Sequence, residues 1–347
     1  MQLIIKTPMG LEKIVASRAL ELVGGRALAR PRGFAGLVIL DGLEDPDGAV
    51  ELVEKSIPEA EYVLRVLATS RADLEEVAKL AAELAKKRIS PDETFAVRTM
   101  RRGRHDFTSI DMNVRVGAEV QKATGADVNL TAPDKIVWVE VIGPDVGIAI
   151  TPGDIVWRKK RPGKPSVLKL LKRISFAQMP YLGEGARFMG IRVGRAAQAF
   201  ELGELVVTPH QPVDIEELNE FLSGVLEGRE SRFRIQKRTY ARKVIRVPVK
   251  LQDLYQFVRD RSGEHIIVTD PTGKTVIEAA DELEQAFRSG GRINILAGAR
   301  EGVPKGVFRF ATAVIDLCPG LTFATEHAIP ATLSAMITCL EERGLLS

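Results

Sequence analysis

The sequence predicts a multidomain chain of α/β and α+β architecture, on three observations. After about residue 175, short apolar strands alternate with amphipathic helices, which favours a mostly parallel sheet covered by helices on both faces. Residues 1–68 instead follow the order strand, helix, strand, strand, helix, strand. Residues 157–173 are strongly basic, contain no acidic residue and are interrupted by prolines, as expected of a linker.

Residues 1–68 are predicted to form a small ferredoxin-like module, because this order of elements is typical of that fold. Strands are expected at 3–6, 34–40 and 62–67. One helix is expected at 11–22, ending at Gly24 and Gly25, and another begins at the sequence Asp45-Pro46-Asp47. Nothing in this segment suggests catalysis.

A second module is predicted at 69–153. It begins with an amphipathic helix at 74–85 and continues through a strand, a basic loop, a helix near 112–123 and two more strands. Its candidate RNA-binding residues crowd around the turn at Gly103, and they are Arg98, Arg101, Arg102, Arg104 and His105. Guanidinium groups present fixed, forked donors suited to phosphate oxygens. The alternative is an ordinary solvated basic loop.

Two further basic segments are candidates for contact with RNA. The linker, assigned to 154–174, carries Lys159, Lys160 and Arg161. The stretch 229–250 carries Arg238 and Arg242 and has Glu230 as its only acid. This second stretch either follows an RNA backbone or forms a salt-bridged surface against the acidic helix at 214–227, and the sequence leaves both open.

The C-terminal unit, 175–347, is expected to contain strands at 191–193, 205–207, 266–269, 293–296 and 313–317. Helices are expected at 215–225, 276–287 and 329–340. Two strands run into loops of small residues, at 297–304 and 318–320. Because such loops meet at one edge of a parallel sheet, they predict a crevice where a ligand contacts bare backbone.

Several other classes of protein are disfavoured. Cys318 and Cys339 lack metal-ligand spacing, so neither a zinc site nor a disulfide framework is expected, and a reducing cytoplasm is the simpler compartment. The N-terminus is too polar for a signal peptide, and no apolar run is long enough to span a bilayer. The Gly273-Lys274-Thr275 sequence lacks the earlier glycine of a phosphate loop, and no G-x-G-x-x-G follows a strand.

Two family resemblances bring these segments together. The arginine-rich strand, Gly117 and the sequence "DVNLTAPDKIVWVEV" resemble a THUMP domain, an RNA-binding module of tRNA-modifying enzymes. The two loops of small residues resemble the cofactor-binding end of the SPOUT methyltransferases, whose knotted loops hold S-adenosylmethionine. This second resemblance implies the cofactor-binding residues Leu296, Ala297, Gly298, Glu301, Gly302, Leu317, Cys318, Gly320, Leu321, Thr325 and Ile329.

Residue roles follow from the SPOUT resemblance. The sequence "GIRVGRAAQAF" resembles the first motif of the ribose-methylating branch, so Arg195 would assist deprotonation of a ribose 2′-hydroxyl. The asparagine that this branch carries upstream is replaced here, near Met189 or Gly190. Gly298 and Gly302 would let backbone approach the cofactor. Thr325 would cap the last helix, and Pro330 would lie in the first turn of that helix.

The whole chain resembles the archaeal THUMP–SPOUT tRNA methyltransferases. The resemblance implies 2′-O-methylation of a cytidine in the acceptor stem, at position 6, with S-adenosyl-L-methionine as cofactor and no metal. It also implies that tRNA is bound by its 3′ end and acceptor stem, and that the SPOUT domain forms a homodimer in the cytoplasm with no membrane attachment. Alternatives are a base-methylating SPOUT enzyme that uses Glu301, Glu326 or His327 as base, a non-catalytic RNA-binding adapter, and an enzyme acting on rRNA.

Overall fold

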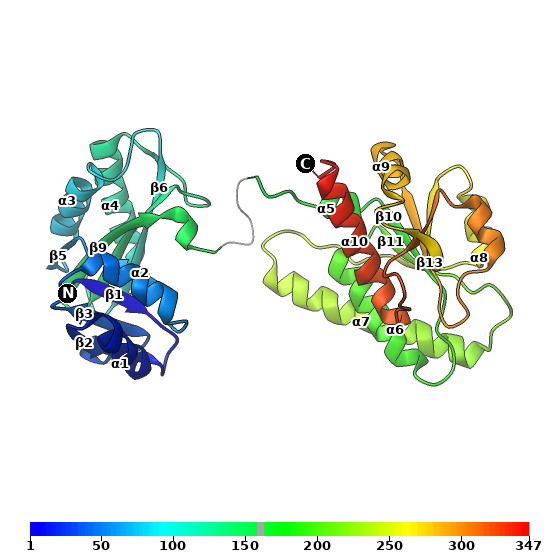
Figure 1. Ribbon diagram of the computed structural model, residues 1–347, viewed down its shortest axis with the longest axis horizontal. Coiled ribbons are helices and arrows are strands. Elements are labelled where there is room, and N and C mark those ends of the chain that lie inside the picture. Colours follow the sequence, from blue (N-terminus) through cyan, green and yellow to red (C-terminus); the bar gives the residue numbers. More distant parts are fainter. Residues whose placement is uncertain (158–162, 347) are drawn as a thin grey trace. The chain divides into compact units, whose positions relative to one another are not determined.

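The computed structural model describes residues 1–157 and 163–346 (Figure 1). The chain divides into two compact units, Met1–Lys164 and Pro165–Ser347. The basic residues expected at 159–161 lie outside the described residues.

The first unit begins with a four-stranded antiparallel sheet in the order β2-β3-β1-β4. Its elements are β1 (Leu3–Lys6), α1 (Glu12–Val23), β2 (Arg26–Ala29), η1 (Pro31–Gly33), β3 (Leu37–Asp41), α2 (Pro46–Ser56) and β4 (Tyr62–Arg65). The predicted order of elements is confirmed. Asp45 caps α2 by accepting a hydrogen bond from the Gly48 amide at 3.0 Å, and Pro46 occupies the first turn, where its missing N–H costs nothing.

A five-stranded sheet follows in the same unit, in the order β5-β9-β8-β6-β7. Its elements are β5 (Ala68–Arg71), α3 (Leu74–Ala85), β6 (Thr94–Arg102), α4 (Ser109–Thr124), β7 (Asp127–Val128), β8 (Lys135–Ile142), β9 (Asp145–Pro152) and η2 (Gly153–Ile155). The apolar faces of α3 and α4 pack on this sheet around Phe95, Met112 and Val139. The predicted helix at 74–85 is confirmed, as are the strand and helix that flank the basic loop.

The two sheets of the first unit share a buried contact. Ile4 and Leu64 of the first sheet pack against Ile136 and Trp138 of the second. Beside them, Lys6 forms an ion pair with the buried carboxylate of Glu140, and its ammonium lies 4.5 Å from the Trp138 ring centre. The cation and the carboxylate therefore compensate one another where water is largely excluded.

The second unit contains a six-stranded sheet in which every pairing is parallel, in the order β12-β11-β10-β14-β13-β15. Its elements are α5 (Leu168–Leu171), β10 (Ile174–Gln178), α6 (Ala186–Phe200), β11 (Glu204–Val207), α7 (Ile215–Thr239), β12 (Val249–Leu251), α8 (Leu254–Asp260), β13 (His265–Thr275), α9 (Ala280–Arg288), β14 (Ile293–Ala297), η3 (Lys305–Phe310), β15 (Ala313–Asp316), η4 (Thr325–His327) and α10 (Ala328–Glu342). The predicted parallel sheet is confirmed.

Both faces of this sheet are buried, as a parallel sheet requires. Phe176 and Ile295 belong to the core that includes residues of α6, α7, α9 and α10. Their neighbours Ala177 and Leu296 belong to the opposite core, which includes Phe257 of α8. This alternation follows from the two-residue period of side chains along a strand.

The strand expected at 191–193 is wrong, because these residues lie inside α6. Ile191 and Val193 are β-branched and stand between glycines, a local composition that favours a strand. Tertiary packing decides otherwise, because Val193 faces the core while the glycines face another helix. The pattern also missed β10, the central strand that precedes α6.

Helices α6 and α7 touch backbone to backbone. Each helix contributes two glycines to the contact, namely Gly190, Gly194, Gly224 and Gly228. A Cβ atom on Gly228 would stand 1.9 Å from the carbonyl oxygen of Ile191, and one on Gly194 would stand 2.0 Å from that of Val225. Only glycine therefore permits this approach. The helix α10 lies beside α6 in turn (Figure 1).

A buried carboxylate marks the amino-terminal end of the sheet. Glu204, at the start of β11, accepts hydrogen bonds from Ser175 at 2.7 Å, Lys250 at 2.6 Å and Arg261 at 2.8 Å. Burial acts to raise the pKa of Glu204, but these hydrogen bonds outweigh it and lower the pKa to about 2. The carboxylate therefore stays charged and holds three strands together.

Candidate functional site

Two cavities of about 310 Å³ each open where strands of the parallel sheet end. The first, here called the loop cavity, follows β13, β14 and β15 and is lined by 269–271, 297–302, 316–317, 321–325 and 328. The second, here called the His210 cavity, follows β10 and β11 and is lined by 179–183, 209–211, 213, 217 and 299–301. The two cavities share the wall formed by 299–301, so ligands in them would be neighbours.

The wall of the loop cavity includes a tight glycine contact. A Cβ atom on Gly298 would lie 2.9 Å from both the Cα and the carbonyl carbon of Gly302. Gly302 itself has a φ of +71°, a conformation that favours glycine. The contact therefore keeps the loop at 298–302 closely packed beside the cavity, and the role of the two glycines in cofactor binding stays a prediction.

Two carboxylates reach the loop cavity that sequence reasoning missed. Asp270 follows the buried part of β13, and Asp316 ends β15. Burial acts to raise the pKa of Asp270, but hydrogen bonds from Thr272 and the charge of Lys305 lower it overall. Asp316 accepts a hydrogen bond from the Cys318 amide at 3.0 Å. Acids just after apolar strands were the signal that would have identified them.

Most of the expected cofactor-binding residues line the loop cavity, and they are Ala297, Gly298, Glu301, Gly302, Leu317, Leu321 and Thr325. The others do not line it. Leu296 and Ile329 are buried in the two cores on opposite faces of the sheet, and Cys318 and Gly320 belong to the turn after β15.

The expected capping role of Thr325 is wrong. Thr325 begins the short turn η4, and the residue before α10 is His327, which makes no side-chain cap. The turn η4 comes between Thr325 and the helix, so α10 starts at Ala328, two residues later than a cap at Thr325 would imply. Pro330 does lie in the first turn of α10, where proline is tolerated.

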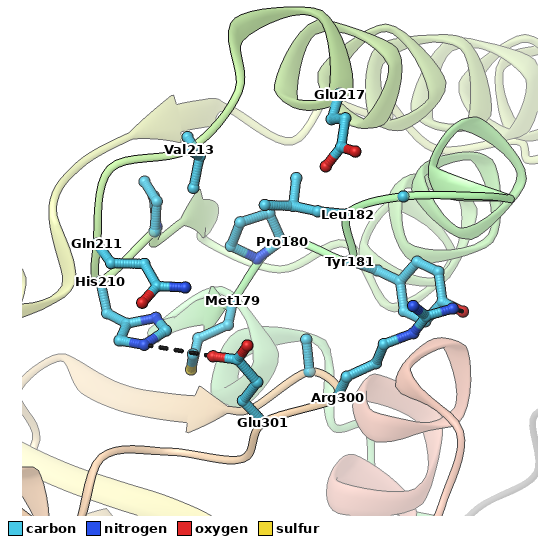
Figure 2. Close-up of a pocket in the computed structure, with 13 residues that line it drawn as sticks. Met179, Pro180, Tyr181, Leu182, His210, Gln211, Val213, Glu217, Arg300 and Glu301 are labelled. Carbon is cyan, nitrogen blue, oxygen red and sulfur yellow. Dashed lines mark hydrogen bonds and ion pairs between the residues drawn. The ribbon is translucent and has the colours of Figure 1, made fainter.

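The His210 cavity combines an apolar surface with polar groups on several sides (Figure 2). Its apolar residues are Met179, Pro180, Leu182 and Val213. The His210 Nε2 atom lies 3.7 Å from the Glu301 Oε2 atom. Across the cavity, the Arg300 guanidinium lies 4.4 Å from the centre of the Tyr181 ring, and Glu217 approaches from α7.

Arg195 lines neither of these cavities. It lies in α6, and its Nη1 atom donates a hydrogen bond to the Ser231 hydroxyl of α7 at 2.7 Å. Its role as a catalytic residue stays a prediction.

The three alternative bases differ in position. Glu301 lines both cavities. Glu326 is paired with Arg192 at 2.5 Å; burial acts to raise its pKa, but backbone hydrogen bonding and Arg192 lower it overall. His327 is exposed and lines neither cavity. Geometry therefore favours Glu301 among them.

The predicted RNA-binding residues of the first unit differ in their exposure and in the groups that they contact. Arg104 is exposed and lines, with His105, a cavity of about 730 Å³. Arg101 is half-buried, with its Nη1 atom 3.4 Å from His105. Arg102 instead donates to the buried Glu140 carboxylate at 2.7 Å. Arg98 is half-buried, 5.9 Å from the Trp138 ring centre.

In the second unit, Arg238 is exposed at the end of α7. Arg242 forms a two-point ion pair with the buried carboxylate of Glu201, so its charge is largely compensated. Salt bridging also occupies Arg246, which pairs with Glu230 at 2.8 Å. Salt bridging therefore occupies part of the stretch 229–250, but to Glu201 and Glu230 rather than to the helix expected at 214–227, and contact of this stretch with RNA stays a prediction.

No cluster of three or more metal-ligating side chains occurs in the described ranges 1–157 and 163–346. Within the same ranges, no helix combines the length and apolar character needed to cross a bilayer.

The second unit is therefore an α/β domain with two neighbouring cavities at the loop end of its parallel sheet, and the first unit carries an arginine-rich loop. Residues 168–347 match the family described as AF2226-like SPOUT RNA Methylase fused to THUMP, and residues 71–151 match the THUMP domain. The chain therefore belongs to the family of THUMP-fused SPOUT RNA methylases.

The chain is also similar to individual proteins. An uncharacterized protein of Methanocaldococcus jannaschii is 42% identical over 341 residues, covering 97% of this chain and 93% of its own. A tRNA (guanine(6)-N2)-methyltransferase of the same organism is 33% identical over 169 residues, covering 44% of this chain and 41% of its own. A crystal structure of a Pyrococcus horikoshii protein covers 99% of this chain and 100% of its own, at 14% identity and a TM-score of 0.37, which is too low to carry an argument.

Proposed function

We propose that the protein is an S-adenosyl-L-methionine-dependent tRNA methyltransferase that methylates the ribose 2′-hydroxyl of a cytidine in the acceptor stem, at position 6. The observation that carries this proposal is the pair of cavities sharing the wall at 299–301. One cavity has the glycine contact suited to a cofactor, and the other lies where a nucleotide would meet it.

The lining of the loop cavity suits the chemistry of the cofactor, and its volume of about 310 Å³ lies at the lower end of ligand pockets. Gly298 and Gly302 line it, and their backbone would contact an adenosyl group, as the family resemblance implies. Asp270 and Asp316 supply carboxylates that would accept hydrogen bonds from ribose hydroxyls or an ammonium group. When bound, S-adenosyl-L-methionine supplies a methyl group on a positively charged sulfur, open to direct displacement.

Arg195 would lower the pKa of the ribose hydroxyl and orient it, as the family resemblance implies. Because Arg195 lines neither cavity of its own chain, this role requires a second copy whose α6 approaches the site. The proposal therefore includes a homodimer formed through the SPOUT domain. The ferredoxin-like module and the THUMP domain would bind the 3′ end and acceptor stem, with Arg101 and Arg104 contacting phosphate.

Base methylation is the second candidate, because Glu301 lines both cavities and would be close to a nitrogen presented there. The test incubates the protein with an unmodified tRNA transcript and methyl-labelled cofactor, then digests the RNA and identifies the labelled nucleoside. A 2′-O-methylcytidine supports the proposal, a base-methylated nucleoside supports the second candidate, and tRNA binding without label favours an RNA-binding adapter.

The role of Arg195 is tested by Arg195→Ala, which should abolish methylation. Arg187→Ala is the matched control, since Arg187 lies on the same helix and makes only exposed ion pairs, which contribute little stability. If Arg195 acts across a dimer, mixing Arg195→Ala subunits with subunits impaired at the loop cavity should restore part of the activity. Failure of such mixtures would place Arg195 outside the mechanism of a shared site.

A further inference from the structure

We propose that the His210 cavity holds the target nucleotide and that His210, paired with Glu301, accepts the proton of the hydroxyl that is methylated. This inference rests on the proposed function and assigns the proton acceptor that the proposed function leaves open.

The His210 cavity lies directly beside the loop cavity. The wall shared by the two cavities is the loop at 299–301. Two side chains of this loop each meet a residue of the His210 cavity, since Arg300 stacks on Tyr181 and Glu301 faces His210. A group held between these two contacts would lie against the loop cavity. Methyl transfer requires this adjacency, because the reacting atoms must approach within about 3–3.5 Å.

The lining of the His210 cavity has the mixed apolar and polar chemistry that a nucleotide requires. A nucleotide has a flat base that favours apolar or stacked surroundings and an edge that needs hydrogen-bond partners. The apolar residues supply the surroundings, and Gln211 and Glu217 supply polar groups for an edge. The Arg300 guanidinium, stacked on the Tyr181 ring, adds a planar cation suited to a phosphate or a base.

His210 is placed to accept a proton within this cavity. Its side chain is only 20% exposed, whereas Glu301 is 67% exposed, so the imidazole is the better shielded of the two. With Nε2 turned to the carboxylate, the ring is oriented, and the imidazolium formed by proton uptake is stabilised. The other ring nitrogen is then the acceptor.

The step balances with these groups. The ribose oxygen forms a bond to the methyl carbon, and the methyl–sulfur bond breaks and leaves its electron pair on the sulfur. The proton of the hydroxyl passes to the ring nitrogen of His210 that is not turned to Glu301. Solvent takes the proton from the imidazolium before the next turnover. No metal or redox partner is involved.

The proton role is tested with His210→Gln and Glu301→Gln in the full chain, with His265→Gln as the matched control. His265 contacts Thr312 at 3.2 Å and lines neither cavity. His210→Gln should lower the single-turnover rate by about 100-fold or more and remove the acidic limb of the rate–pH profile. In His210→Gln, the affinities for S-adenosyl-L-methionine and tRNA should stay within about threefold of the unmodified protein, since the contribution of His210 lies in the reaction step.

The pocket is tested separately with tRNA that carries the fluorescent base pyrrolocytidine at the target position. Unstacking of this base on entering the His210 cavity should raise its fluorescence. Val213→Trp fills the cavity and should abolish the rise while S-adenosyl-L-methionine binding persists, because Val213 does not line the loop cavity.

The outcomes separate the two proposals. A protein that forms 2′-O-methylcytidine but tolerates His210→Gln within threefold overturns the proton role and leaves the proposed function intact. An unchanged fluorescence rise in Val213→Trp overturns the pocket. A base-methylated product or no product from the unmodified protein contradicts the proposed ribose chemistry, and the fluorescence measurement still decides whether the cavity receives the nucleotide.

Discussion

Replacing Gly298 by alanine should weaken cofactor binding without unfolding the protein. The new Cβ atom would stand 2.9 Å from two backbone atoms of Gly302, whereas ordinary contacts begin near 3.4 Å. The loop must therefore open by about half an ångström, and backbone rather than a flexible side chain has to move. The loop borders the cavity directly, so this displacement changes the surface that the cofactor would meet.

The expected size follows from the cost of overpacking, about 1–3 kcal/mol. If the loop relaxes in the free protein and must be restored on binding, the dissociation constant rises by about 5- to 150-fold. Isothermal titration calorimetry with S-adenosyl-L-methionine measures this change, and the melting temperature without ligand measures the part of the cost that falls on the fold. The loss of binding free energy and the loss of stability should together equal the cost of the strain.

Gly306→Ala is the matched control. Gly306 lies in η3, a few residues further along, and its nearest neighbour would be a side-chain atom of Arg309 at 3.7 Å, an ordinary contact. Its affinity and melting temperature should match the unmodified protein. A Gly298→Ala protein that binds the cofactor with unchanged affinity would refute the assignment of this loop as cofactor-binding.

Three further predictions test other parts of the molecule. Arg104→Ala should weaken tRNA binding and lower the slope of log affinity against log salt concentration by about one, which filter binding at several salt concentrations measures. Arg102→Ala should chiefly lower the free energy of unfolding, by about 1–3 kcal/mol, which urea titration measures. Glu217→Gln should reduce the preference for cytidine over uridine at the target position by about tenfold, because an amide can donate a hydrogen bond as well as accept one. Glu216→Gln is the control, since Glu216 lines neither cavity. Competition between tRNAs with cytidine and with uridine at that position measures the preference, and equal effects of the two variants would contradict the prediction. The pKa of Glu204 is about 2 in the folded protein against 4.5 ordinarily, so the charged carboxylate contributes stability above pH 4.5 that is lost as the pH falls toward 2. Urea titration should show the free energy of unfolding falling by at most about 3 kcal/mol over this range. Glu204→Gln should remove this part of the pH dependence.

The sequence predicted the elements whose apolar residues form a clear pattern. The helix α10 follows from apolar residues at helical spacing, and the strands β13, β14 and β15 follow from short apolar runs, because a parallel sheet buries both faces of a strand. The segment around Ile191 misled for a physical reason. Its glycines are there to admit another helix, a requirement that no local pattern reveals.

The candidate site was predictable only where single residues are constrained by backbone geometry. Gly298 and Gly302 are such residues, because a Cβ atom on Gly298 conflicts with the backbone of Gly302, and the positive φ of Gly302 favours glycine. His210 carried no local signal, since the role proposed for it depends on Glu301, 91 positions later in the chain. Only the order of strands in the sheet brings these two loops together.

The glycine contact between α6 and α7 has a mechanical consequence. Helices separated by side chains can slide as rotamers readjust, but Gly194 and Gly228 bring backbone directly against backbone and leave nothing to readjust. The two helices should therefore move as a single stiff body that carries Arg195 and Ser231 together. The loops at 179–183 and 299–302 would then move relative to this stiff pair of helices and not together with it.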